Sequence, residues 1–377
     1  MDLSCYNSYY EVDLGKIAQN YNKIEKHTGA KVMPVVKANA YGLGMEEVAA
    51  FLNKKFDVGI FACAQVFEGV VLRESGITNT DILVMGPALP DALSAVVKYD
   101  LQIPAFTPLG VTDLNDAAVA QGKIAKVHIK IETGMNRIGV HGGVELKELL
   151  DTIKKLKNVE IVGAFTHFVE ADTVDSAFTH EQFELFKTAV EEIRAEGFSL
   201  KYVHCCNTCA TEWFTQAIDF STHVRVGSLL YGYSDLGGGT NPIGVREALS
   251  WRAPITNLKT VYPGESVSYS KFFKPSKPTS IAIAGVGFAD GIYNPLAKTG
   301  GAVMVNGIRT KFIDTCMDQC FIDVTDIPCK LGDIVTFFGE SMEGTHLSPQ
   351  EFQCSGQIYT AHMSLGSRRI KRIYINE

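Results

Sequence analysis

Short apolar runs alternate with helical patterns along the N-terminal part of the chain. The runs are often β-branched and uninterrupted, as expected of strands that are covered on both faces. Eight such strands are predicted, beginning near Lys31, Asp57, Asp81, Leu101, Ala125, Val159, Lys201 and Thr222. Helical patterns lie before and between these strands, for example over residues 13–21, 45–55, 91–99, 144–157 and 181–197.

The strand count favours a closed barrel over an open doubly wound sheet, which more often has fewer strands. The pattern changes at a glycine-rich junction near residues 235–242. Beyond it helical patterns nearly vanish, and short β-type runs are separated by Gly, Pro and Asn turns. We therefore expect an α/β chain with an N-terminal (β/α)8 TIM barrel over residues 13–235. An all-β domain should follow over residues 236–377, joined by a strand from residues 1–12.

Composition and charge narrow the classes of function. The chain has 377 residues, of which 46% are hydrophobic, and a formal net charge of −7. That charge argues against nucleic-acid binding, and the basic cluster at 368–372 is too short to reverse the argument. No secretory signal and no apolar run of about 18 residues is visible, so we expect neither secretion nor a membrane helix. Nine scattered cysteines suggest reduced thiols in the cytoplasm, and a single CxxC at Cys206 and Cys209 does not predict a metal site.

Lys37 is the first candidate for chemistry. It ends the apolar strand at residues 33–37 and precedes a loop that contains Gly42 and Gly44. In a TIM barrel the catalytic groups gather at the carboxyl ends of the strands. An amine held there against an apolar wall can lose its proton near neutral pH and form a Schiff base with a carbonyl. A solvated lysine with no special role is the simpler alternative at a strand end.

The ends of the other strands carry cationic groups and hydrogen-bond donors. Arg225 would be costly to bury unpaired, so it should face a ligand or a carboxylate. His128 and His204 are more typical of packing or of support for a site than of catalysis. Hydroxyl and backbone N–H donors of the kind that bind phosphate follow the last strands, at Thr208, Gly227 and Ser228. A lysine, an arginine and phosphate donors together fit pyridoxal phosphate, but they do not select a reaction.

At these residues the chain resembles the alanine racemase family, the fold-type III pyridoxal-phosphate enzymes, over essentially its whole length. The matching motifs are VVKANAYG at 35–42, TGMNRIG at 133–139, THF at 166–168, VRVG at 224–227, SY at 268–269, FADG at 288–291 and CMD at 316–318. The resemblance implies a cytoplasmic homodimer with pyridoxal 5′-phosphate as cofactor. Its expected reaction is the interconversion of L-alanine and D-alanine, an isomerase activity that serves D-alanine biosynthesis.

The resemblance also implies roles for individual residues. Lys37 would bind the cofactor as a Schiff base and act as one catalytic base. Tyr269, supplied by the second subunit, would be the other base. Arg225 would pair with the pyridine nitrogen, and His167 would orient Arg225. Tyr41, Thr208, Gly227 and Ser228 would bind the phosphate.

Two further residues would bind the substrate carboxylate, Arg137 and, from across the dimer interface, Met317. Lys130 matches a position that is often a carbamylated lysine in the family, where it positions the residue equivalent to Arg137. Phe288 occupies the place of a tyrosine that is common near the substrate entry path.

The C-terminal segment departs most from the family pattern. Either Ser367 or Arg368 replaces a bulky active-site tyrosine, and Arg368 becomes a candidate substrate-binding residue. A serine racemase or a racemase of broader specificity is therefore an alternative. An amino-acid decarboxylase fits less well, because that family pairs the ring nitrogen with a carboxylate. A non-catalytic pyridoxal-phosphate carrier would lack the second domain.

Overall fold

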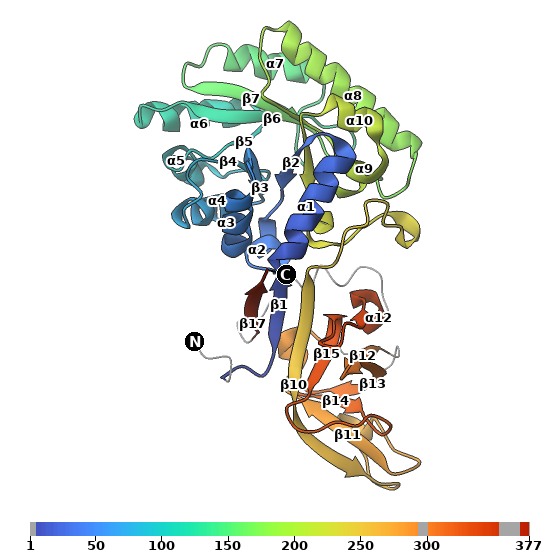
Figure 1. Ribbon diagram of the computed structural model, residues 1–377. Coiled ribbons are helices and arrows are strands. Elements are labelled where there is room, and N and C mark those ends of the chain that lie inside the picture. The colour runs from blue at the N-terminus through green and yellow to red at the C-terminus, as the bar shows by residue number, and fades with distance from the viewer. Residues whose placement is uncertain (1–4, 293–300, 354–369, 377) are drawn as a thin grey trace. The chain divides into compact units, whose positions relative to one another are not determined.

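The computed structural model describes residues 5–292, 301–353 and 370–376 (Figure 1). The chain forms two compact units. One unit comprises residues 17–40 and 45–246, and the other comprises residues 1–16, 41–44 and 247–377. Among the described residues no helix combines the length and the apolar character needed to cross a membrane.

The larger unit is a parallel barrel of eight strands, as predicted. Hydrogen-bonded ladders join β2 to β9, β3 to β4, and β5 through β8 in order. Isolated bridges between Val35 and Ala62 and between Leu83 and Gln102 connect these ladders. The Arg225 N–H donates to the Cys206 carbonyl at 3.1 Å and links the last two strands. The strands are β2 (Lys31–Pro34), β3 (Ile60–Cys63), β4 (Asp81–Val84), β5 (Ile103–Ala105), β6 (Ala125–Lys130), β7 (Val159–Phe165), β8 (Tyr202–His204) and β9 (His223–Val226).

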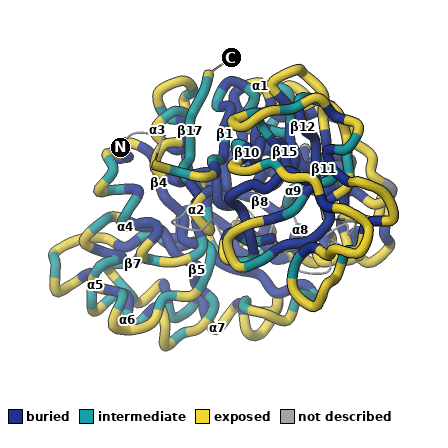
Figure 2. Tube along the Cα trace, turned by 90° about the horizontal axis from the view of Figure 1, so that it is seen from below, coloured by how far each residue is buried: buried dark blue, intermediate teal, exposed yellow. Residues whose placement is uncertain are grey.

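Helices alternate with these strands and cover the barrel. Their outward residues are exposed, whereas a strand such as β8 is buried (Figure 2). α8 begins four residues earlier than the predicted start at 181, because the Ser176 hydroxyl caps it by accepting from the Thr179 N–H. The helical segments are α1 (Leu14–Thr28), α2 (Lys37–Tyr41), α3 (Met45–Lys55), α4 (Val66–Glu74), η2 (Pro90–Ala92), α5 (Leu93–Lys98), α6 (Pro108–Ala120), α7 (Val144–Ile153), α8 (Ala177–Ala195), α9 (Thr208–Trp213), α10 (Thr215–Phe220), η3 (Ser228–Tyr231) and η4 (Gly237–Gly239).

The smaller unit is a β-domain, and the strands among its described residues form one nine-stranded sheet. The sheet order is β16-β15-β12-β13-β14-β11-β10-β1-β17, and β15 also pairs with β10, which closes part of the sheet on itself. The strands are β1 (Tyr9–Asp13), β10 (Leu249–Val261), β11 (Thr279–Ala284), β12 (Ala302–Val305), β13 (Ile308–Thr315), β14 (Cys320–Asp323), β15 (Ile334–Glu340), β16 (His346–Leu347) and β17 (Lys371–Ile375), with the short helical segments η5 (Tyr269–Lys271), η6 (Phe288–Asp290) and α12 (Pro349–Gln353).

An aromatic cluster fills the closed part of the β-domain. Trp251, Phe337, Phe338 and Phe352 are all buried, and the Trp251 and Phe337 ring centroids lie 4.9 Å apart. β1 pairs antiparallel with β10 and parallel with β17, so both described ends of the chain contribute strands to this sheet. The predicted fold class, a (β/α)8 barrel followed by a β-rich domain, is confirmed.

Candidate active site

Lys37 precedes a turn with left-handed backbone conformation after the carboxyl end of β2. The residues that follow it, Ala38, Asn39, Ala40 and Tyr41, have φ values of 52°, 58°, 52° and 55°. Each L-residue in this left-handed region costs about 1–2 kcal/mol. The turn is held by the Asn39 side-chain oxygen, which accepts from the Met45 N–H at 2.9 Å. Strain of this kind is typical of functional sites, where it positions a side chain.

The carboxylate of Glu68, in the first turn of α4, also supports this turn. One oxygen accepts from the Ala38 N–H at 2.6 Å, and the other accepts from the Ala64 and Gln65 N–H groups at 2.7 and 3.1 Å. Glu68 is buried, and these bonds connect the loop after β3 to the residue next to Lys37. Sequence reasoning missed Glu68. No clear motif marked it, because Gln65 at the N-cap of α4 is not one of the residues preferred at a helix start.

The amine of Lys37 lies in a cationic, partly buried environment. Burial lowers its pKa, the positive charges of Arg137 and Arg225 lower it further, and the negative charge of Glu68 opposes them. The net effect is a pKa below the ordinary value of a lysine. Such an amine loses its proton more readily than a solvated one and can then act as a nucleophile or a base.

Arg225 is buried in the barrel among neutral acceptors. Its Nη1 donates to the His204 carbonyl at 2.6 Å and lies 3.0 Å from His204 Nδ1. Its Nη2 donates to the carbonyls of Thr166 and Cys205 at 2.7 and 3.2 Å. Within the described part of the chain, none of its hydrogen-bond partners is a carboxylate. Burial lowers the pKa of Arg225 to about 10, so the guanidinium stays charged at neutral pH.

His167 is not the closest histidine to Arg225. Its Nδ1 lies 3.5 Å from Arg225 Nη2, at the limit of a hydrogen bond, whereas His204 is nearer. Burial and the neighbouring cations Arg225 and Arg137 lower the pKa of His167 to about 3, so its imidazole is neutral at physiological pH. His204, which the sequence suggested as packing or support, makes the shorter contact with the guanidinium.

Lys130 ends β6 and is almost completely buried. Its ammonium group donates to the Ile131 carbonyl at 2.7 Å and lies 5.6 Å from the centroid of the Phe165 ring. Burial lowers the pKa of Lys130 to about 8. The negative charge of Glu132 raises this pKa, and the positive charge of Arg225 lowers it. A minor fraction of this amine is therefore neutral near pH 7, far more than for an ordinary lysine.

The loop after β6 presents Arg137. It is closed by hydrogen bonds from the Glu132 N–H to the Val140 carbonyl and from the Val140 N–H to the Lys130 carbonyl, both at 2.9 Å. The Glu132 carboxylate accepts from the Gly134 N–H at 2.6 Å. Arg137 is exposed on this loop, and its charge acts on Lys37, His167 and Lys130. The barrel therefore brings the basic side chains of Lys37, Lys130 and Arg137 together with the neutral His167.

The predicted phosphate donors of the barrel lie at the ends of β8 and β9. The Gly227 N–H donates to Thr208 Oγ1 at 3.2 Å, and the Ser228 hydroxyl donates to Asp235 Oδ2 at 2.5 Å. Tyr41 belongs to segment 41–44 of the other unit. In that segment the Leu43 carbonyl accepts from the Tyr374 hydroxyl of β17 at 3.0 Å.

Tyr269 lies on a strained loop of the β-domain. Its neighbours Ser268, Ser270 and Lys271 have φ values of 68°, 55° and 54°, and the loop is closed by the Val267 N–H donating to the Phe273 carbonyl at 2.9 Å. The Tyr269 side chain is 71% exposed. The loop therefore holds this phenol outward.

Met317 lies on a second loop beside that of Tyr269. Ser268 Oγ and Cys316 Sγ are 4.0 Å apart, and Met317 is 62% exposed. The loop is fixed to η6 because the Phe288 N–H donates to the Cys316 carbonyl at 3.0 Å. The segment that holds Ser367 and Arg368 lies outside the described residues.

Comparison with known proteins gives one consistent result. The family model for the N-terminal domain of alanine racemase matches residues 12–235, and that for the C-terminal domain matches residues 248–374. An alanine racemase of Citrifermentans bemidjiense is 34% identical over 376 residues, with 97% of this chain and 98% of that protein covered. One from Methanococcus maripaludis is 34% identical over 377 residues, with the same coverage.

Solved structures agree with the sequence relatives. An alanine racemase from Clostridium difficile has a TM-score of 0.91 at 29% identity, covering 98% of this chain and 96% of that one. One from Bacillus anthracis, solved with L-Ala-P bound, has a TM-score of 0.89 at 30% identity, covering 99% and 96%. Both domains and nearly every residue are matched, and the chain belongs to the alanine racemase family.

Proposed function

We propose that this protein is a pyridoxal-phosphate-dependent racemase that interconverts L-alanine and D-alanine. Membership of the alanine racemase family supports this proposal over the whole length of the chain. The observation that carries it in the structure is the Lys37 amine, which has a lowered pKa and lies at the carboxyl end of a barrel strand beside cationic groups.

The residues of the barrel fit pyridoxal phosphate. Lys37 supplies an amine that can bond to an aldehyde, and Arg225 supplies a buried cation. Thr208, Gly227 and Ser228 carry hydroxyl and backbone N–H groups of a kind suited to a phosphate, which would replace the present acceptors Thr208 Oγ1 and Asp235 Oδ2. We add Tyr41 to this set. When bound, this cofactor withdraws electron density from the Cα–H bond of an amino acid and so makes the proton removable.

Arg225 favours a racemase over a decarboxylase. A guanidinium next to a ring nitrogen disfavours a proton on that nitrogen, whereas a carboxylate favours it. The described partners of Arg225 are carbonyl oxygens and imidazole nitrogens, which hold the guanidinium in place and leave its charge uncompensated. His167 and His204 contact Arg225 and orient it.

Racemisation requires two groups that exchange protons with opposite faces of Cα. We assign these roles to Lys37 and Tyr269. The lowered pKa of Lys37 allows its amine to accept a proton near neutral pH. Tyr269 is an exposed phenol on a strained loop, as expected of a group that serves a site outside its own domain.

The exposure of Tyr269 and Met317 supports a homodimer in which each subunit completes the site of the other. Both residues lie on adjacent loops of the β-domain, and both are largely exposed in the single chain. Backbone strain of the kind seen around Tyr269 is typical of functional sites. In this arrangement the backbone of Met317 binds the substrate carboxylate together with Arg137.

Lys130 completes the substrate site as a carbamate. Its neutral amine adds to carbon dioxide, an N–C bond forms, and the displaced proton passes to water. The product is an anion in place of a cation. An anion at this buried position attracts the guanidinium of Arg137 and keeps it oriented toward the carboxylate of the substrate.

The decisive experiment is incubation of the purified holoenzyme with L-alanine in D2O. Loss of both the Cα proton signal and the optical activity is the expected result. Release of carbon dioxide instead would identify a decarboxylase, and bound cofactor without exchange would identify a carrier. A parallel incubation with L-serine measures the substrate preference, and we expect alanine to be the better substrate.

A further inference from the structure

A continuous row of hydrogen-bonded side chains crosses the interior of the barrel. Gln102 precedes β5, His128 lies in β6, His204 in β8 and Arg225 in β9, and all four are at most 3% exposed. Gln102 Oε1 lies 2.7 Å from His128 Nε2, His128 Nδ1 lies 2.9 Å from His204 Nε2, and His204 Nδ1 lies 3.0 Å from Arg225 Nη1. Branched aliphatic residues usually fill such an interior, so a polar row must be fully satisfied to be tolerated.

The chemistry of Arg225 determines where the protons lie along this row. A guanidinium only donates, so His204 Nδ1 must accept. In a neutral imidazole the other nitrogen then carries the proton, and His204 Nε2–H donates to His128 Nδ1. By the same rule His128 carries its proton on Nε2. That N–H points at Gln102, which must present its oxygen rather than its amide nitrogen.

Burial and the nearby charge of Arg225 hold both imidazoles in the neutral form. Burial lowers the pKa of His128 to about 3 and lowers that of His204 well below its ordinary value, and the nearby Arg225 charge adds to both effects. The rings are also fixed in orientation, since His128 stacks on Tyr202 with centroids 5.3 Å apart. A Cβ on Gly163 would come within 2.5 Å of His128 Nδ1, so only glycine leaves room for the ring.

We propose that Gln102 is a positioning residue for the active site, as the terminal acceptor that keeps His128 and His204 in the Nε2–H tautomer and so keeps Arg225 oriented. The proposal rests on the proposed function in one respect, the assignment of Arg225 to the ring nitrogen of the cofactor. Without an acceptor at position 102, the His128 Nε2–H is buried without a partner. Moving that proton to His128 Nδ1 would make it face the N–H group at His204 Nε2. If His204 then moved its own proton to Nδ1, that N–H group would face the guanidinium of Arg225.

The test is 15N NMR of the holoenzyme labelled at histidine, with Gln102→Leu and Gln102→Glu as variants. The wild type should show both imidazoles as neutral Nε2–H tautomers. Gln102→Leu should lose the hydrogen-bonded Nε2–H signal of His128 and lower kcat about tenfold with little change in KM, the kinetic equivalent of one buried hydrogen bond. Gln102→Glu keeps an acceptor oxygen and should retain both tautomers and most of kcat.

Gln182→Leu is the matched control. Gln182 is equally buried, but it donates to Thr133 Oγ1 at 3.1 Å, outside the row. This variant should lose stability and keep the tautomers of His128 and His204. The proposal is overturned if wild-type His204 carries its proton on Nδ1, if Gln102→Glu behaves like Gln102→Leu, or if Gln102→Leu changes neither spectrum nor kcat. Because the tautomers are read without turnover, a failure of the proposed racemase activity would leave this result interpretable.

Discussion

The Glu68 carboxylate accepts a hydrogen bond at 2.6 Å from the backbone N–H of Ala38, the residue that follows Lys37. The same carboxylate accepts from two N–H groups at the start of α4. The carboxylate therefore connects the left-handed turn at residues 38–41, whose backbone conformation is unfavourable by itself, to the start of helix α4. A carboxylate offers only acceptors, so it suits a position at which three N–H groups converge.

Glu68→Gln should weaken this support and change the acidity of Lys37. One amide N–H₂ would face backbone N–H donors, so we expect a loss of about 1–3 kcal/mol in the free energy of unfolding, measured in urea. Removing the negative charge that raises the pKa of Lys37 should lower that pKa further. The pH midpoint for covalent capture of pyridoxal phosphate, trapped by borohydride, should move to lower pH. Glu74→Gln, on the exposed side of α4, should change neither quantity.

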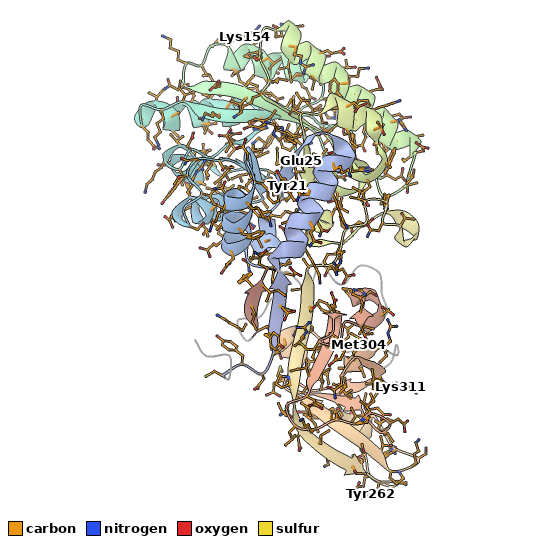
Figure 3. All side chains as sticks on the ribbon, in the orientation of Figure 1. Tyr21, Glu25, Lys154, Tyr262, Met304 and Lys311 are labelled. Atoms are coloured by element: carbon orange, nitrogen blue, oxygen red, sulfur yellow. The ribbon has the colours of Figure 1, made fainter. Side chains whose placement is uncertain are left out.

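Tyr269→Phe should lower kcat by about 10²- to 10⁴-fold, the usual contribution of a positioned acid or base. Cofactor absorbance should be retained, because Lys37 is unchanged. Tyr262 is also an exposed tyrosine of the β-domain, directly after the C-terminal residue of β10 (Figure 3), and Tyr262→Phe is the matched control. Equal turnover in Tyr269→Phe and wild type would remove Tyr269 from the mechanism.

Mixing two inactive variants should restore activity if the subunits share their sites. In a dimer of one Lys37→Ala subunit and one Tyr269→Phe subunit, one site lacks both groups and the other site has both. Unfolding and refolding the mixed variants should therefore recover a fraction of the wild-type rate. If Tyr269 served the site of its own chain, every site would lack one base and no activity would return.

Lys130 should form a carbamate in bicarbonate buffer. Its pKa of about 8 leaves a reactive neutral amine at physiological pH. With 13C-bicarbonate, the wild type should give a carbamate carbon signal that Lys130→Arg lacks, since arginine is not carbamylated. Lys126→Arg, at the less buried start of the same strand, should keep the signal. Persistence of the signal in Lys130→Arg would assign it to another amine.

Glu212 should make the barrel less stable as pH rises toward neutrality. Burial raises the pKa of this carboxyl to about 7, and the Ser234 hydroxyl lies 3.0 and 2.8 Å from its two oxygens. The folded state then binds the proton more tightly than the unfolded state. The resulting stability, about 3 kcal/mol, is complete below pH 4.5 and is lost as pH rises through about 7. The free energy of unfolding, measured in urea between pH 4.5 and 7, should no longer fall with pH in Glu212→Gln. The exposed Glu184→Gln variant should keep the pH dependence of the wild type.

The sequence by itself determined the elements and the candidates for chemistry. The spacing of hydrophobic residues and the content of β-branched residues are local properties of the sequence. The strands near Lys31, Asp81 and Ala125 could therefore be located without any knowledge of their neighbouring strands. The strict alternation then specified a barrel, and a lysine at a strand end was a candidate for the same reason. The ordered motifs identified the family, because their residues are contiguous.

Only the tertiary structure decided how the candidates are held. Glu68 lies 30 residues from Ala38, and His204 lies 21 residues from Arg225, so no periodicity relates these pairs. Their hydrogen bonds arise because closing the barrel brings the ends of distant strands together. The same closure turned Gln102, an ordinary polar residue in the sequence, into the end of a buried row that leads to Arg225. Burial there leaves each donor dependent on one protein acceptor, since water cannot replace it.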